Sequence, residues 1–551
     1  MTQQPPRRPA PLPGPASGPA DRAPGAPGAY DADAAHLESL GYKQELKRSL
    51  SVFGNIAMGF ATVSPVVGLY AVVQLGVVVA GPAWVWALPV VFLLQALVVC
   101  VYAELAADFP ISGGAYQWTR RLIGPKYAWI VGWITVCALI FAHTTIAYLA
   151  SPWFFALFGW TPTPGRVVAV AALFLVLCAL INAYGIDVLK RVVDLGIAAE
   201  AVASVLVGFG LLLLFREHGF SILTDTFGAE ALSDGSKPMA FLAALAVAGW
   251  AFVGFDACVA MAEETVGAAK QVPRALWWAF ISVGLIVILN AVAVDLAHPD
   301  PARIMLGEDL DPVTTAVVAA FGDWSSKPFI VVVIVAFVAC ALASQGGGAR
   351  AMFSMARDGV LPASKTLRRI NKRQVPLGAL AVDLVISCCA LLLGLEASAI
   401  GSIVTFGSSA LYLTFLAIAF AALVARVRGT WVPSGIRLGR VGLVINIGAV
   451  LWLAFEFVNI TWPRKLLAPP DAPAYQVWAA VIGIALVLGT GLVYLVAARP
   501  QRALEAAALT QEAVAPHAPA HDALDNPATP NDDARDAAAS NSPAPTTGST
   551  A

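Results

Sequence analysis

The chain has 551 residues, of which 58% are hydrophobic and only 13% charged, and its mean hydropathy is +0.75. This composition excludes an ordinary soluble domain and predicts an all-α polytopic membrane protein embedded in the lipid bilayer. Because the net charge is only −1, no electrostatic attraction to nucleic acid is expected. The seven cysteines lie in apolar stretches without a CxxC pair, so we expect buried thiols and no metal site.

Low-complexity sequence rich in Ala and Pro occupies both ends of the chain and predicts disordered tails at residues 1–36 and 500–551. The first tail contains no continuous apolar segment, so a cleavable signal peptide is not expected. The intervening residues, 37–499, are predicted to form one membrane domain. The high Ala, Pro and Gly content is typical of a GC-rich bacterial genome, which predicts a location in the plasma (inner) membrane.

Twelve apolar segments, each near the ~20 residues that the hydrocarbon core of a bilayer requires, divide this domain. Lys and Arg residues concentrate in the segments on the side of the N-terminus, which predicts that both termini are cytoplasmic. The predicted spans are about 50–79, 84–106, 128–157, 167–184, 192–215, 239–262, 275–297, 329–353, 377–395, 399–424, 442–460 and 477–497.

Two of these segments are interrupted at their centres, and the other spans are expected to support them. The first reads GFATVSPVVG at residues 59–68, where Pro65 has no backbone donor. The second, ending at Asp256, reads AGWAFVGFD, where Gly249 and Gly254 weaken the helix. Packing glycines and a simple proline kink are the alternative for either segment alone. Paired breaks at corresponding positions of two halves, however, predict the binding site of a secondary transporter.

An odd number of spans per repeat inverts the second copy, so the two breaks predict a five-plus-five inverted repeat. The repeats cover about 50–215 and 239–425, and two extra helices follow at about 442–497. A broken helix exposes free N–H groups at one half-helix end and free C=O groups at the other, which attract anions and cations respectively. The residues expected to contact the solute are Ala61, Thr62, Val63, Ser64, Trp250, Ala251, Phe252, Val253 and Gly254.

Two carboxylates inside the spans are candidates for coupling or gating. Glu200, in the fifth span, is costly to bury, and we interpret it as a proton-coupling site, with a structural hydrogen bond as the alternative. Asp256, just after the second break, is suited to countering an ammonium group, relaying a proton or capping the second half-helix. Trp250 is suited to a cation–π contact with an amine, worth ~2 kcal/mol when the site is desolvated.

Five separated blocks of the chain carry a specific pattern. They read LGYKQELKRSLSVFGNIAMGF, YAELAADFPISGGAYQW, GWAFVGFDACVAMAEET followed by VPRAL, ARAMFSMARDGVLPAS and RLGRVGLVINIGAVLW. In this order they resemble the amino acid–polyamine–organocation permeases, most closely their amino acid/choline transporter subgroup. The resemblance implies a leucine-transporter-like fold, with the site between the unwound centres of spans one and six. It also implies that Trp250 closes over the solute, that Ser344 faces the first break, and that Glu200 lies near a coupling-cation position.

The first break departs from the pattern common in amino acid permeases of this superfamily. They often carry a small triplet such as Gly-Ser-Gly, whose amides hold the substrate carboxylate, whereas this chain reads Ala61-Thr62-Val63-Ser64-Pro65. Hydroxyl donors remain at Thr62 and Ser64, but a carboxylate cradle is less well supported. Choline-like amines, polyamines and γ-aminobutyrate therefore stay beside α-amino acids as candidate solutes.

Other functional classes find less support in the sequence. HExxH, GxSxG and Walker A motifs are absent, so we expect no enzyme, no catalytic residues and no cofactor. A channel is the second class, but rings of charge or repeated filter loops are not apparent. We therefore expect alternating-access transport of a small molecule, coupled to H+ with Na+ as the alternative ion. The sequence carries no signal for an oligomeric state or for uptake over efflux or exchange.

Overall fold

The computed structural model describes residues 27–70, 72–396, 400–465 and 473–503, which belong to one compact unit of the chain that ends at Glu505. Apart from an isolated β-bridge between Leu50 and Thr265, the regular secondary structure of these ranges is helical. Twelve helical segments within them are long and apolar enough to cross a membrane, which confirms the predicted all-α polytopic class.

The spanning segments follow the predicted order. The first two are Val52–Tyr70, with α2 (Val52–Val63) and α3 (Pro65–Tyr70), and Val73–Asp108, with α4 (Val73–Ala80), η1 (Gly81–Trp86) and α5 (Ala87–Asp108). The third and fourth are single helices, α7 (Pro125–Phe158) and α8 (Pro164–Ala183). The fifth, Ile186–Leu214, contains α9 (Ile186–Glu200), the π-helical turn η2 (Ala201–Leu206) and α10 (Val207–Leu214), and the sixth, Lys237–Ala260, contains α11 (Lys237–Ala248), η5 (Gly249–Phe252) and α12 (Ala257–Ala260).

The second six are more regular. They are α13 (Ala268–Ala297), α16 (Ser326–Arg357), α18 (Leu377–Leu391), α19 (Ile400–Val427), α20 (Gly439–Thr461) and α22 (Ala479–Ala498). Short helices in the connections include α6 (Gly114–Leu122), α14 (Pro301–Met305), α15 (Pro312–Phe321), α17 (Ser364–Leu367) and α21 (Ala474–Val477).

The first break is a turn of one residue between α2 and α3. Ser64 has a φ of 48°, in the left-handed region that a residue with a side chain rarely adopts. Pro65 then opens α3, where its missing N–H and fixed φ are compatible with a first helical position. The predicted span 50–79 is accordingly divided: α2 and α3 form the first spanning segment, whereas α4 begins the second, so the boundary between these two spans lies earlier than predicted.

The second break is longer and passes through η5, a 3-10 turn. Gly254 has a φ of 95°, which only glycine adopts readily, and α12 resumes the helix for four residues. Four residues, Val253 to Asp256, therefore lie outside any helix at the centre of this span. Both breaks occur where the sequence predicts them.

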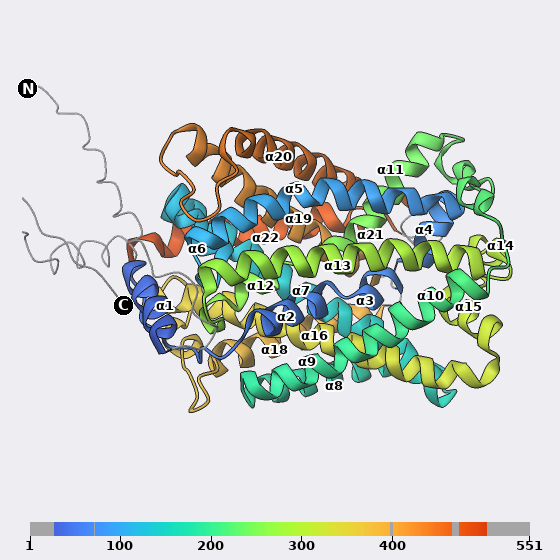
Figure 1. The fold of residues 1–551 in the computed structure, drawn as a ribbon, viewed down its shortest axis with the longest axis horizontal. Helices are drawn as coiled ribbons and strands as arrows, with labels where there is room; N and C mark the ends of the chain where they lie inside the picture. Colours follow the sequence, from blue (N-terminus) through green and yellow to red (C-terminus); the bar gives the residue numbers. More distant parts are fainter. Residues whose placement is uncertain (1–26, 71, 397–399, 466–472, 504–551) are drawn as a thin grey trace, which may run out of the picture. The chain divides into compact units, whose positions relative to one another are not determined.

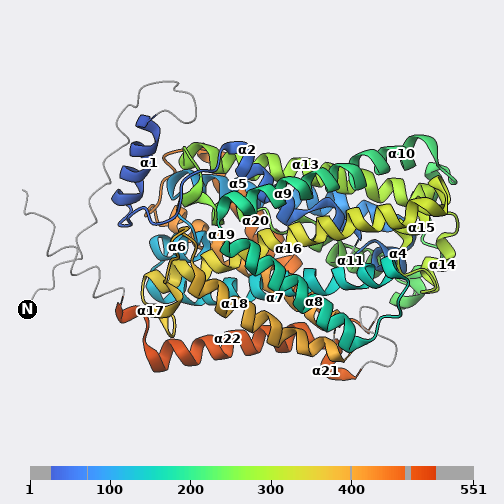
Figure 2. The ribbon, with the colours of Figure 1, turned by 90° about the horizontal axis from the view of Figure 1, so that it is seen from below.

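The two broken helices lie inside the bundle. Helix α2 packs against α13 and α16, while α11 packs against α4, α5 and α20. Helices α5, α13 and α20 run along the horizontal direction of Figure 1, and α5 packs against both of the others. Helix α22 lies at the edge of the bundle in Figure 2, and most of its surface is exposed, as expected for an extra helix in contact with lipid.

The N-terminal boundary differs from the prediction of a disordered tail up to residue 36. Residues 27–39 form a helix, α1 (Pro27–Ser39), whose Asp33 carboxylate accepts the N–H of Gly267 at 2.6 Å. The same carboxylate lies 3.5 Å from the guanidinium of Arg48, and Leu37 is buried. These tertiary contacts compensate for the weak amphipathic pattern of the segment. Residues 1–26 and 504–551, the remainder of the predicted tails, lie outside the described residues.

Candidate functional site

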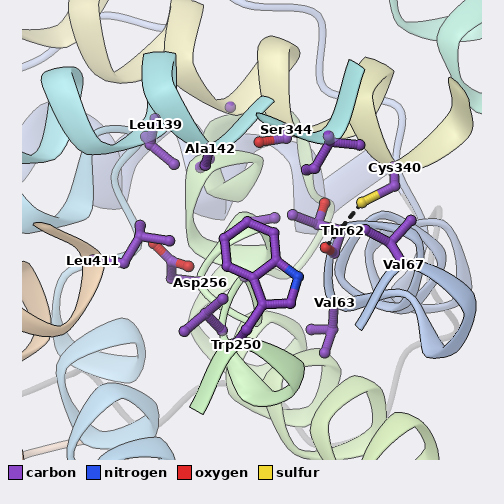
Figure 3. Close-up of a pocket in the computed structure, with 16 residues that line it drawn as sticks. Thr62, Val63, Val67, Leu139, Ala142, Trp250, Asp256, Cys340, Ser344 and Leu411 are labelled. Atoms are coloured by element: carbon purple, nitrogen blue, oxygen red, sulfur yellow. Dashed lines mark hydrogen bonds between the residues drawn. The ribbon is translucent and has the colours of Figure 1, made fainter. Parts of the chain in front are cut away.

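A cavity of about 50 Å³ lies between the two broken helices, with room for a few water molecules. Figure 3 shows the indole of Trp250 in the middle of its lining residues, with Asp256 on one side and Thr62 on the other. The cavity is lined by Thr62, Val63, Val67, Leu139, Ala142, Ile146, Trp250, Val253, Gly254, Asp256, Ala257, Ala260, Cys340, Ser344, Gly347 and Leu411.

The structure brings most of the predicted site residues together at this cavity. Among the predicted contacts, the lining includes Thr62, Val63, Trp250, Val253 and Gly254, and among the gating candidates Asp256 and Ser344. It does not include Ala61, Ser64, Ala251, Phe252 or Glu200. Sequence reasoning did not identify the apolar wall from α7, α16 and α19, because these side chains carry no signal beyond hydrophobicity.

Phe252 and Phe255 pack away from the cavity. Phe252 is fully buried against Phe92, with ring centroids 5.8 Å apart. Phe255 makes an edge contact with Tyr102, with centroids 5.4 Å apart. Both rings therefore stabilise the second break from behind, and Trp250 is the aromatic side chain that faces the solute space.

At the first break, the N–H groups are occupied by groups of the protein itself. The N–H of Ser64 donates to the Phe60 carbonyl at 2.8 Å, and Pro65 has no N–H. The N–H of Val66 donates to Glu200 Oε2 at 3.0 Å, and that of Val67 to Ser64 Oγ at 3.0 Å. The expectation of free amides at this break is therefore wrong, because a carboxylate from α9 and a serine hydroxyl cap α3.

The hydroxyl donors expected at the first break are also occupied. Thr62 Oγ1 donates to the Met58 carbonyl at 2.8 Å, and the Ser64 hydroxyl donates to Glu200 Oε1. The Thr62 carbonyl accepts from the Cys340 thiol at 3.3 Å, as Figure 3 shows. This half of the site consequently offers a solute mainly apolar surface.

The second break retains unoccupied backbone donors. Within the described ranges, no backbone hydrogen bond starts from the N–H groups of Val253, Gly254, Phe255 or Asp256. Val253, Gly254 and Asp256 line the cavity. The second break therefore has capacity for polar contacts that the first break lacks.

Asp256 is the only acidic or basic side chain among the described residues that line the cavity. The remaining polar side chains are the Thr62 and Ser344 hydroxyls, the Cys340 thiol and the Trp250 indole N–H. One carboxylate beside one indole face, without a competing cation, is suited to a small solute that carries a positive charge.

A second cavity, of about 40 Å³, adjoins the first on the side of α6. The two share four lining residues: Leu139, Asp256, Ala260 and Gly347. Asp256 therefore borders both spaces. Together the cavities form an interrupted path from the centre of the bundle toward the end that carries α6.

Buried ion pairs close the bundle at that end. Arg357 binds Glu263 in a bidentate contact, with Nη2 2.9 Å from Oε1 and Nη1 3.1 Å from Oε2, and Arg350 binds Glu264. Asp358 accepts from Arg120 Nη1 at 2.7 Å. Burial lowers the pKa of Arg120, but Tyr42 and Asp358 outweigh this effect and raise it overall, so the guanidinium stays charged.

Comparison with known proteins identifies relatives along nearly the whole membrane domain. A family model described as amino acid permease matches residues 50–487. The chain is 27% identical to the amino-acid permease BAT1 of Arabidopsis thaliana, over 84% of this chain and 93% of that protein. It is 26% identical to amino-acid permease 2 of Neurospora crassa, over 80% and 84% respectively. It is also 26% identical to the low-affinity putrescine importer PlaP of Escherichia coli, over 58% and 69%.

Proposed function

The chain belongs to the family of amino acid permeases, and from this premise we propose that it carries a small organic amine across the membrane by proton-coupled alternating access. The observation that carries the proposal is the central cavity, whose described lining contains Asp256 and the Trp250 indole but no basic side chain. A carboxylate and an aromatic face both stabilise an ammonium group.

Because the amide donors at the first break are already occupied, an amine without a carboxylate is favoured as the solute. An α-amino acid needs donors for its carboxylate, and the amides of α3 already bind Glu200 and Ser64. A solute whose only charge is cationic needs no such donors. PlaP, a relative of this chain, is named as a putrescine importer, which agrees with an amine substrate.

An amino acid is the second candidate, because the second break offers donors of its own. Val253 and Gly254 border the cavity, and their N–H groups are not used in backbone hydrogen bonds within the described ranges. They are suited to a carboxylate such as that of an α-amino acid or γ-aminobutyrate. Several relatives are named as amino-acid permeases.

Proton coupling is proposed to act through Glu200. Its carboxylate accepts from the Ser64 hydroxyl and the Val66 N–H, and it is 1% exposed. Protonation of Oε1 would reverse the bond with Ser64, whose hydroxyl would then accept, and protonation of Oε2 would break the bond with the Val66 N–H. Proton binding would thereby be linked to the position of α3, which forms one wall of the cavity through Val67.

The protein is a multi-pass membrane protein. Because the number of candidate spans is even, we propose that both termini lie on one side. We assign that side to the cytoplasm of a plasma membrane from the distribution of Lys and Arg. In this orientation the ion pairs of Glu263 and Glu264 form the inner closure.

Uptake into proteoliposomes tests the proposal. Labelled putrescine, choline, γ-aminobutyrate and leucine are offered with an imposed proton gradient, a sodium gradient or neither. We expect saturable accumulation of an amine with the proton gradient alone. Accumulation with sodium alone would contradict proton coupling. Single-channel conductance would indicate a channel. If no solute accumulates under any gradient, the carrier assignment is contradicted.

A further inference from the structure

A buried carboxylate from one of the two extra helices lies directly behind the second break. Glu456, on α20, is fully buried, and α20 runs alongside α5 and α19 in Figure 1. Its Oε1 lies 3.1 Å from the position that a Cβ on Gly249 would occupy, and the Tyr412 hydroxyl lies 3.2 Å from the same point. Gly249 therefore allows a close approach, since a side chain there would press both groups away by a few tenths of an ångström.

The two oxygens of this carboxylate have different surroundings. Oε2 accepts from the Asn459 amide at 3.1 Å, whereas Oε1 has no hydrogen-bond partner although it is buried. Acceptors for a donor at Oε1 lie in the adjacent turn, where the Gly249 carbonyl accepts from the Tyr412 hydroxyl at 3.1 Å. A protonated carboxyl would supply that donor, and an ionised carboxylate cannot.

A polar chain connects this carboxylate to the end of α20. Asn459 joins Glu456 to Arg464, whose Nη2 donates to Asn459 Oδ1 at 2.5 Å. Tyr412 and Arg464 are the titratable groups that face the carboxylate, and no ion pair joins Arg464 to it in the described part of the chain. The other acidic and basic side chains of α5, α11, α19 and α20 lie toward the helix ends, at Glu104, Asp108, Lys237, Arg426 and Arg440.

We propose that Glu456 is a proton-binding site, at which proton binding is linked to the position of the turn that carries Trp250. A proton taken up from water forms an O–H group at Oε1, while Oε2 keeps its hydrogen bond from Asn459. This group donates to the Gly249–Tyr412 pair and so holds the start of η5. Loss of the proton returns Oε1 to an acceptor and releases the turn, and Trp250 follows because it is the next residue.

This inference rests on the proposed function for its role in transport, but the site itself is defined without it. Glu200 serves the first break from α9, and Glu456 serves the second break from α20, outside the predicted repeats. Each broken helix would thus have its own titratable carboxylate, and proton binding would act on both walls of the cavity.

The test compares the wild type with Glu456→Gln in proteoliposomes, with a pH-sensitive dye inside the vesicles. Glu308→Gln, the same change on an exposed acid, is the control. We expect E456Q to lose about tenfold in gradient-driven accumulation and to admit fewer protons per solute, while equilibrium exchange stays within about twofold. Unchanged proton entry per solute in E456Q would overturn the proposal.

A second readout separates this inference from the proposed function. Infrared difference spectra between acidic and basic pH report the carbonyl band of protonated carboxyl groups in the purified protein. We expect part of this band to vanish in E456Q and to persist in E308Q, even if the wild type transports none of the solutes offered. An identical band in both variants would show that Glu456 does not bind a proton.

A further variant keeps the test open if E456Q does not fold. Asn459→Leu removes the amide that holds Oε2 and leaves the carboxyl in place. We expect the pH midpoint of uptake, or of the infrared band, to shift by about one unit. A midpoint equal to that of the wild type would count against the proposal.

Discussion

The carboxylate of Glu200 accepts a hydrogen bond from the hydroxyl of Ser64, across 136 residues of sequence, at the point where the first broken helix resumes. Its second oxygen accepts a hydrogen bond from the N–H of Val66 at 3.0 Å. Glu200 therefore supplies two acceptor oxygens at the N-terminus of α3, the position where an anionic substrate group would otherwise bind.

Replacing Glu200 tests both its hydrogen bonds to the start of α3 and its proposed role in proton coupling. Glu200→Gln keeps the size of the side chain but presents an amide where a carboxylate accepted two donors. We expect a loss of about 1 kcal/mol in the free energy of unfolding, as for other helix caps, and loss of pH-driven uptake with counterflow retained. Glu217→Gln, on an exposed acid, is the control. Unchanged pH-driven uptake in E200Q would exclude Glu200 as the coupling group.

Asp256→Asn tests recognition of positive charge in the central cavity. Removing the one acidic side chain of the lining should weaken binding of a cationic amine by about 2 kcal/mol, roughly 30-fold in the apparent affinity. The measurement is the concentration dependence of initial uptake. A neutral analogue of the amine should lose much less, and equal losses for both would point to a structural role for Asp256.

Trp250 is expected to contribute through its aromatic face. Trp250→Leu should reduce amine affinity by about tenfold or more, whereas Trp250→Phe should retain much of it, because the ring quadrupole attracts the cation. Titration calorimetry with the purified protein measures both. If Leu and Phe variants bind equally well, the indole only fills space.

The bidentate pair between Arg357 and Glu263 is expected to stabilise the closed inner end of the bundle. Glu263→Gln leaves a buried guanidinium without its anion and should cost about 3–5 kcal/mol of stability. The double variant Glu263→Gln/Arg357→Met should recover part of this loss. Thermal unfolding of the wild type, Glu263→Gln, Arg357→Met and the double variant measures the coupling in a double-mutant cycle, and additive losses would show that the pair is not coupled.

A pH dependence of stability follows from His298, which follows α13 outside the spanning segments. Burial lowers the pKa of His298, and Asp309, whose Oδ2 lies 2.9 Å from Nε2, opposes this only in part. Because the unfolded chain binds this proton more readily, stability is highest above the unfolded pKa of about 6.5 and falls as the pH decreases. We expect His298→Asn to reduce the pH dependence of the thermal unfolding midpoint between about pH 7.5 and about pH 5.5. The same pH dependence in the variant and the wild type would contradict this.

Much of the architecture could be predicted from local sequence. The breaks at Pro65 and Gly254 follow from backbone chemistry, since one residue lacks an N–H and the other adopts a φ of 95°. Trp250 and Asp256 reach the cavity because they lie within or beside the second break. Local chemistry was less informative about α1, which depends on the contacts of Asp33 with Arg48 and Gly267.

Partners across helices could not be predicted. Asp383 and His143 are isolated polar residues in two apolar spans, and only the fold brings the carboxylate Oδ2 to 3.2 Å from Nε2 of the imidazole. The expected amide donors of the first break were wrong for the same reason, because the group that occupies them, Glu200, comes from a distant span.

The sequence by itself determined the class of protein, the twelve spans, the two breaks and the family, because hydropathy, proline and glycine act within about 20 residues along the chain. Only the tertiary structure decided which carboxylates from distant spans lie beside each break. Glu200 meets Ser64 and Glu456 meets Gly249 through the packing of helices. Such pairing depends on how side chains of different helices pack together, so it cannot be predicted from the sequence of one helix.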